Sequence, residues 1–234
     1  MYGLEEALAE ARAVAVAVDA HAPAARVALC PPATLIDRMA HALAGSGVEV
    51  GGQDCHAEPQ GAFTGCVAAE MLADAGATLV IVGHSERRTY FGETDADVAA
   101  KVLAALRAGL EPIVCVGETA AARRAGRTLD MVLGQLSGSL PDALAGQPFA
   151  LAYEPVWAIG SGVTPTGQQI EEVHGVIREA LRRRWPGDLT PILYGGSVKP
   201  DNAAEILRLG DVGGALVGGA SLTAAQFLPI VQAA

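Results

Sequence analysis

The stretch FALAYEPVWAIGSGVTP, residues 149–165, decides how the chain folds. Its first five residues are continuously apolar, whereas a strand with one face in water alternates apolar and polar side chains. A loop with two glycines and two prolines follows, and residues 168–184 then have the composition of a long helix. An apolar strand joined to a helix in this way is typical of parallel sheets that are covered on both faces.

The same unit recurs along the whole chain. Short apolar runs lie at residues 26–30, 48–52, 78–82, 110–116, 149–153, 190–194 and 214–217. Helical stretches lie at residues 4–20, 33–44, 67–75, 95–108, 129–140, 168–184, 202–209 and 224–231. This alternation predicts parallel βαβ units and therefore a fold of the α/β class.

The number of predicted strands raises a question about how the sheet closes. A closed barrel of eight strands needs a strand before its first helix, but this chain opens on the helix at residues 4–20. Seven strands would leave an unpaired sheet edge or require a different closure. The units therefore predict either an open doubly wound sheet or a barrel whose first strand is absent from the sequence given.

The composition excludes several classes of protein. Hydrophobic residues make up 51% of the 234 residues and charged residues 18%, which excludes intrinsic disorder. No apolar run reaches the roughly 18 residues of a membrane span, and the acidic N-terminus does not resemble a secretory signal. The net charge of −10 argues against a nucleic-acid partner, although a helix N-terminus can still bind a small anion.

The cysteines predict neither a disulfide nor a metal site. Cys30, Cys55, Cys66 and Cys115 are separated by 25, 11 and 49 residues, which matches no zinc or redox spacing. We expect reduced thiols in a cytosolic protein. Cys115 stands where a nucleophile could act, but no base lies near it in the sequence, and a packing role is favoured.

Two titratable residues stand at or just past the ends of apolar runs. In parallel α/β folds, ligands bind at the carboxyl ends of the strands. Glu154 ends the run at 149–153, where a carboxylate has to be paired, solvated or functional. His84 follows the run at 78–82, so it is either a general acid or electrophile or a structural histidine. The other four histidines are interpreted as structural.

Three loops at the strand ends have compositions that favour ligand binding. The loop from Pro155 to Pro165 combines stiff ends with central glycines, as a lid does, although an ordinary βα loop can look the same. Glycine loops at residues 195–197 and 218–221 follow the last two strands and enter helices, where backbone N–H groups can bind phosphate. The P-loop and dinucleotide-binding patterns are absent.

Eight stretches, taken in order, resemble the triosephosphate isomerase family over essentially the whole chain. The two that carry the chemistry are VGHSERR at residues 82–88 and AYEPVWAIG at residues 152–160. The two that resemble phosphate loops are YGGS at residues 194–197 and LVGGAS at residues 216–221. The others are PP at residues 31–32, GAFTG at 61–65, FGET at 91–94 and CVGE at 115–118.

The resemblance implies a single (β/α)8 TIM-barrel domain over residues 1–234 with its first strand missing. It implies a cytoplasmic, homodimeric isomerase of glycolysis and gluconeogenesis that interconverts dihydroxyacetone phosphate and D-glyceraldehyde 3-phosphate through an enediolate. Glu154 would remove a proton from the carbon next to the carbonyl, and a neutral His84 would polarise the oxygens. Glu86 would support the site. No metal or organic cofactor is implied.

The resemblance also assigns binding residues. Backbone N–H groups of Gly160, Ser197, Gly218 and Gly219 would bind the phosphate of the substrate. A lid would close over this phosphate and keep water from the enediolate, which can otherwise lose its phosphate. The lid would comprise Pro155, Val156, Trp157, Ala158, Ile159, Gly160, Ser161, Gly162, Val163, Thr164 and Pro165. Phe63, Thr64 and Gly65 would form a dimer loop, which in the family plugs a pocket beside the neighbour's active site.

The sequence departs from the family at its start. The family has an Asn and a catalytic Lys in a Gly-Asn-Trp-Lys-Met stretch on its first strand, whereas this chain begins at Met1. Lys101 and Lys199 are the only lysines, and neither matches that position. One hypothesis is that the gene starts upstream. The other is that the chain is this short and nearly inactive, in which case a non-catalytic phosphate-binding relative is the alternative function.

Two smaller departures concern the dimer loop and the lid. Cys66 stands where the family usually has an acidic residue that pairs with an arginine across the dimer, which predicts a weaker interface. Val163, Thr164 and Pro165 stand where the family usually has Lys-Thr-Ala at the second hinge of the lid. We expect the proline to stiffen that hinge, because its ring fixes the backbone.

Overall fold

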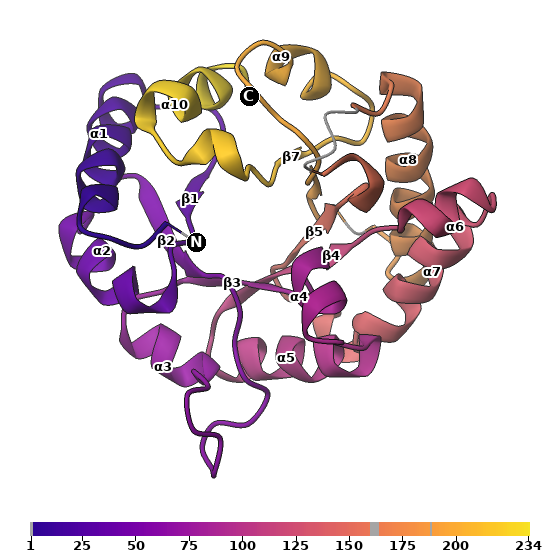
Figure 1. The fold of residues 1–234 in the computed structure, drawn as a ribbon, viewed down its shortest axis with the longest axis horizontal. Helices are drawn as coiled ribbons and strands as arrows, with labels where there is room; N and C mark the ends of the chain where they lie inside the picture. The colour runs from indigo at the N-terminus through magenta and orange to yellow at the C-terminus, as the bar shows by residue number, and fades with distance from the viewer. Residues whose placement is uncertain (1, 160–163, 188) are drawn as a thin grey trace.

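The computed structural model describes residues 2–159, 164–187 and 189–234 and contains a parallel sheet whose strands follow chain order (Figure 1). Its strands are β1 (Val27–Leu29), β2 (Val48–Gly52), β3 (Leu79–Val82), β4 (Glu111–Val116), β5 (Ala150–Tyr153), β6 (Ile192–Tyr194) and β7 (Gly214–Ala215). Each predicted apolar run contains one of these strands, so the strand prediction is confirmed.

Helices surround the sheet and form an outer ring in Figure 1. They are α1 (Glu6–His21), α2 (Ile36–Ala42), α3 (Ala69–Asp74), α4 (Ser85–Tyr90), α5 (Asp95–Arg107), α6 (Ala120–Arg124), α7 (Thr128–Ser139), α8 (Gly167–Arg184), α9 (Ala203–Ile206) and α10 (Ala224–Gln232). Eight coincide with predicted stretches to within a few residues, but α4 and α6 were not expected. Helices of six and five residues are too short to show a helical period of apolar side chains.

The strand order decides between the two architectures left open by the sequence. All neighbouring strands pair in parallel, and the order β1 to β7 never reverses. A doubly wound sheet has a point where the order reverses and helices cover both of its faces. Here the sheet curls and the helices lie on its outside (Figure 1), so the doubly wound alternative is wrong and the fold is a (β/α) barrel.

The buried residues form two clusters, one on each side of the curled sheet. The larger cluster lies between the strands and the surrounding helices and includes Tyr153 and Ile177. A smaller cluster of Ile81, Cys115 and Ala152 comes from adjacent strands. Cys115 is fully buried there, as its packing role predicts, and all four cysteines are free thiols. No helix in the described part of the chain is long and apolar enough to cross a membrane.

Candidate active site

Glu154 lies at the carboxyl end of β5 and is only 1% exposed. Its backbone N–H donates to the Val116 carbonyl at the end of β4, at 2.8 Å. Two glycines leave room for it. A Cβ on Gly117 would lie 1.8 Å from the Glu154 carbonyl oxygen, and a Cβ on Gly195 would lie 2.9 Å from its Cγ. The glycines at these two strand ends are therefore required by the close approach of Glu154.

Two residues at the start of α4 contact the Glu154 carboxylate. The Ser85 N–H donates to Oε2 at 2.9 Å, and the Ser85 hydroxyl donates to Oε1 at 2.9 Å. His84 Nε2 lies 3.0 Å from the same Oε1. The structure thus brings together the two residues that the sequence analysis selected from separate strands. The sequence analysis did not select Ser85, because a serine beside a histidine carries no signal of its own.

The hydrogen bonds of His84 define its tautomer. Its Nδ1 lies 3.3 Å from the Glu86 backbone N–H, which can only donate, so Nδ1 accepts. The ring proton therefore sits on Nε2, which donates to Glu154. His84 thus presents an N–H donor beside a carboxylate, an arrangement suited to general acid–base chemistry. Glu86 contributes through its backbone, whereas its side chain is exposed.

The environment of Glu154 changes how strongly it binds a proton. Burial raises the pKa of the carboxyl above its ordinary value, because the charged form loses its hydration. Contacts with His84 and Ser85 act in the opposite direction but do not offset burial. Its contacts within the described part of the chain include no arginine or lysine. The ionised carboxylate is thus a stronger base than an exposed glutamate.

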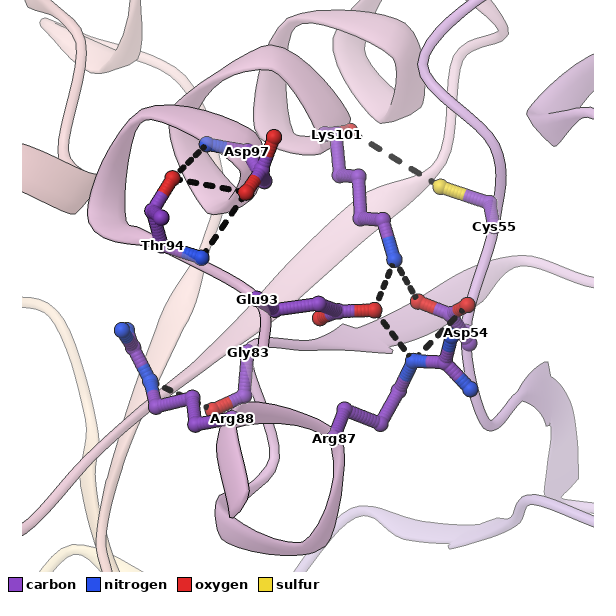
Figure 2. Close-up of polar contacts among 9 residues, drawn as sticks. All are labelled: Asp54, Cys55, Gly83, Arg87, Arg88, Glu93, Thr94, Asp97 and Lys101. Carbon is purple, nitrogen blue, oxygen red and sulfur yellow. Dashed lines mark hydrogen bonds and ion pairs between the residues drawn. The ribbon is translucent and has the colours of Figure 1, made fainter. Parts of the chain in front are cut away.

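Helix α4, which carries these contacts, is too short to be stable alone and is held by tertiary ion pairs. Its arginines diverge in Figure 2, with Arg88 turned away from Arg87. Arg87 Nε lies 3.0 Å from Asp54 Oδ2 and also pairs with Glu93. Lys101 Nζ lies 2.6 Å from Asp54 Oδ1 and shares Glu93 with Arg87. Two cations and two carboxylates thus form a balanced ion cluster beside α4.

The glycine loops lie at the carboxyl ends of β6 and β7, the strands that follow β5 in the sheet. The Ser197 carbonyl accepts a hydrogen bond from Asn202 Nδ2 at 3.0 Å, which fixes the shape of the first loop. The backbone N–H groups of Ser197, Gly218 and Gly219 donate no hydrogen bond within the residues that the structure describes. These groups can therefore donate to an anion.

The first part of the predicted lid is anchored on a second buried glutamate. Residues Val156–Ala158 form the 3-10 helix η3. Trp157 Nε1 donates to Glu118 Oε1 at 2.7 Å, and the Tyr153 hydroxyl donates to Oε2 at 3.1 Å. Arg123 pairs with the same carboxylate at 3.2 Å and stacks over the Trp157 ring. Glu118 was missed as a functional residue, although it follows an apolar run much as Glu154 does.

The described lid residues differ in burial. Pro155 and Ala158 are buried, whereas Ile159 is 37% exposed. At the far end Thr164 is exposed and Pro165 is buried, immediately before the capping box that starts α8. Four lid residues lie outside the described residues, as does Met1: Gly160, Ser161, Gly162 and Val163.

Comparison with known proteins places this arrangement of residues in a family. The sequence model of triosephosphate isomerase matches residues 1–234. The chain belongs to the triosephosphate isomerase family. Triosephosphate isomerase of Caulobacter vibrioides is 58% identical over 235 residues, which cover 100% of this chain and 93% of that protein. The triosephosphate isomerase of Afipia carboxidovorans is 57% identical, with 100% and 94% covered.

A solved structure supports the same assignment. The crystal structure of triosephosphate isomerase from Bartonella henselae superimposes with a TM-score of 0.93 at 44% sequence identity. The match covers 100% of this chain and 94% of that chain. The resemblance stated from the sequence is thereby confirmed, as is the barrel fold that it implied.

The expected dimer loop of this triosephosphate isomerase family member projects from the barrel. All residues from 58 to 66 are exposed, and Figure 1 shows this segment extending beyond α3. Phe63 is 43% exposed, and its ring lies 4.1 Å from that of His56. Thr64 and Gly65 at the tip are exposed.

Neither lysine lies at the Glu154 site. Lys101 belongs to the ion cluster beside α4, and Lys199 is exposed, with its backbone N–H bonded to Asn202 Oδ1 at 2.8 Å. Among the described residues, no group of three His, Cys, Asp or Glu side chains is arranged to hold a metal ion. Within the described part of the chain, the polar groups at the site thus include the His84 and Ser85 donors, the Glu154 carboxylate and the N–H groups of the glycine loops.

Proposed function

We propose that the chain interconverts dihydroxyacetone phosphate and D-glyceraldehyde 3-phosphate by proton transfer through an enediolate. The observation that carries the proposal is the contact between Glu154 and His84. Oε1 of Glu154 lies 3.0 Å from Nε2 of His84. The carboxylate has a raised pKa, and the Nε2 atom of His84 faces it as a donor. Membership of the triosephosphate isomerase family supports the same reaction.

Each residue has a distinct part in the proposed reaction. The Glu154 carboxylate removes a proton from the carbon next to the substrate carbonyl and returns it to the neighbouring carbon. The Nε2–H of His84 donates to the substrate oxygens and stabilises the negative charge that develops on them. The N–H groups of Ser197, Gly218, Gly219 and Gly160 bind the phosphate, and Glu86 supports the site.

The lid from Pro155 to Pro165 protects the intermediate. Closure removes water, which otherwise promotes loss of phosphate from the enediolate. The contact from Trp157 to Glu118 gives the first end of the lid a fixed position from which to close. The buried Pro165 gives the second end a fixed backbone before α8 begins.

We also propose that the protein is a single-domain homodimer of the cytoplasm. The projecting residues Phe63, Thr64 and Gly65 support a dimer, because an exposed apolar tip gains stability when a neighbour covers it. Cys66 carries no charge for an arginine of the partner, so Cys66→Glu should tighten the dimer. Sedimentation at a series of concentrations measures this, and an unchanged dissociation constant would count against the idea.

Turnover on glyceraldehyde 3-phosphate tests the proposed reaction. Two forms should be compared: the 234-residue chain, verified by intact mass, and the same chain with an added N-terminal Gly-Asn-Trp-Lys segment. A positioned cation at a developing oxyanion is worth about 10²–10³ in rate, so the extended form should be faster by that factor. Equal, near-normal turnover in both forms would show that the lysine is dispensable here.

A second measurement separates the isomerase from a non-catalytic relative. Both forms should bind 2-phosphoglycolate, a phosphorylated carboxylate that resembles the enediolate, because the glycine loops are present in each. Folded protein that binds this probe but gives no turnover in either form would refute the isomerase proposal and favour phosphate binding alone.

A further inference from the structure

Arg88 is a largely buried cation that the proposed chemistry does not use. It lies in α4, next to Arg87, and its side chain is only 14% exposed. Its Nη1 donates to Asp95 Oδ1 at 2.6 Å, and its Nη2 donates to the Ser139 hydroxyl at 3.0 Å. The carboxylate balances the charge of the guanidinium, which still has N–H groups for other partners.

These remaining N–H groups reach two backbone carbonyls at the carboxyl end of the sheet. Arg88 Nε donates to the Gly83 carbonyl at 2.9 Å, the contact drawn in Figure 2, and Nη2 donates to the Cys115 carbonyl at 3.2 Å. Val82 and Val114 form the last pair between β3 and β4. Gly83 and Cys115 follow them directly, so the guanidinium joins the two strands just beyond their last pair.

Each of these carbonyls belongs to a peptide unit that leads to the reactive pair. The Gly83 carbonyl shares a planar unit with the nitrogen and Cα of His84, so fixing its oxygen restricts how His84 can rotate. Gly83 has a φ of +70°, a left-handed conformation that sets this carbonyl direction. The Cys115 carbonyl precedes Val116, whose own carbonyl accepts the Glu154 N–H at 2.8 Å.

We infer that Arg88 is a positioning residue that fixes the separation of His84 and Glu154. Its rigid, planar guanidinium donates hydrogen bonds to the Gly83 and Cys115 carbonyls and so holds both in place. The inference rests on the proposed function, because it concerns the same reacting pair. Arginine offers five N–H donors in a planar fork, whereas the single ammonium of lysine cannot donate along all of these directions at once.

Arg87 provides a matched control in the same turn of α4. It carries the same charge, and Figure 2 shows it pointing to the opposite side, toward Asp54 and Glu93. Its side chain is 29% exposed, and its hydrogen bond and ion pairs go to side chains of the ion cluster. A lysine in its place keeps the charge of that cluster and leaves the strand ends untouched.

The experiment compares Arg88→Lys with Arg87→Lys in whichever form of the chain turns over. Small displacements of reacting groups cost up to about 10²-fold in rate, so Arg88→Lys should lower kcat about 10–100-fold. KM should change much less, because the phosphate loops are unaffected. Arg87→Lys should leave kcat within about threefold of wild type. In Arg88→Ala, added ethylguanidinium should restore part of the lost kcat by occupying the vacated space.

A second readout does not depend on turnover. The ring ¹H–¹⁵N signals of His84 should shift in Arg88→Lys but not in Arg87→Lys, with circular dichroism confirming that both variants are folded. Unchanged His84 signals, an unchanged kcat, or equal losses in both variants would overturn the positioning role. If neither form of the chain gives turnover while these signals still shift, the proposed function fails but Arg88 still positions His84.

Discussion

Glu118 and Glu154 are buried glutamates that follow neighbouring strands, and they differ in what surrounds them. Their exposed fractions are 0% and 1%. Glu118 lies 3.2 Å from the Arg123 guanidinium and also accepts hydrogen bonds from Tyr153 and Trp157. Glu154 accepts hydrogen bonds from the N–H and hydroxyl of Ser85 and from Nε2 of His84.

The difference teaches that burial alone does not make a carboxylate reactive. A buried charge with a cation and two further donors is satisfied, so Glu118 anchors the start of the proposed lid. Burial raises the pKa of Glu154 above its ordinary value despite its contacts with His84 and Ser85, so Glu154 remains ready to accept a proton. Variants at or beside each of the two glutamates test this comparison.

The largest effect is expected for Glu154→Gln. The amide cannot accept the substrate proton, so kcat should fall about 10²–10⁴-fold, while binding of 2-phosphoglycolate is retained. Glu118→Gln is the matched control and should mainly lower the free energy of unfolding, by about 1–3 kcal/mol, because Arg123 loses its charged partner. Steady-state kinetics and urea denaturation measure these effects. Equal losses of kcat in both variants would end the distinction between the two glutamates.

The raised pKa of Glu154 predicts where activity is lost in acid. As pH falls, the carboxylate gains a proton and can no longer act as a base, so kcat/KM should drop about tenfold per pH unit below that pKa. Because burial raises the pKa, this fall should begin at a higher pH than for an exposed glutamate. A profile of kcat/KM against pH with its acid limb at the ordinary glutamate value would contradict the prediction.

The same pKa shift fixes how stability depends on pH. The native pKa of Glu154 lies above that of the unfolded chain, so its stabilising contribution is complete below the unfolded pKa. That contribution is lost as pH rises through the native pKa. Glu154→Gln does not titrate, so its free energy of unfolding relative to wild type should be higher near pH 8 than near pH 4. Denaturant midpoints at both pH values measure this difference. The opposite trend would show that folding lowers the pKa of Glu154 rather than raising it.

Ser85→Ala tests how the Ser85 hydroxyl affects the pKa of Glu154. The variant removes the hydroxyl that donates to Oε1 but keeps the N–H that donates to Oε2. One hydrogen bond to a charged group is lost, so the pKa of Glu154 should rise further and kcat/KM should fall about tenfold at neutral pH. The acid limb of the profile should move upward with it. A fall in kcat/KM without that movement would assign the hydroxyl another role.

The smallest effect is expected for Trp157→Phe on the side of Glu118. The ring still packs beneath Arg123, but the Nε1–H donor to Glu118 is lost. Tyr153 and Arg123 still hold the carboxylate, so the cost should be about 1 kcal/mol, seen in lid kinetics rather than in global unfolding. Relaxation measurements on lid amides detect it, and lid rates equal to those of wild type would argue against an anchoring role.

Much of the fold and part of the site follow from local patterns. Short, mainly apolar runs located each strand in the described part of the chain, since parallel strands are covered on both faces. The rule that ligands meet the carboxyl ends of parallel strands selected Glu154 and His84, which the structure brings to within 3.0 Å. The same rule applies to Glu118, which was overlooked, but Ser85 and Arg88 could not be selected, because a serine or an arginine beside a strand end is common and reveals no partner.

The sequence by itself determined the order of strands and helices, the apolar core and the position of a carboxylate and a histidine after two strands. These features depend on residues that are close in the chain and on the fixed period of each element. Only the tertiary structure decided the sheet order, the tautomer of His84, the role of α4 and which buried glutamate has a cation beside it. Those depend on contacts between residues such as Arg88 and Cys115, far apart in sequence, whose distances the folded chain alone sets.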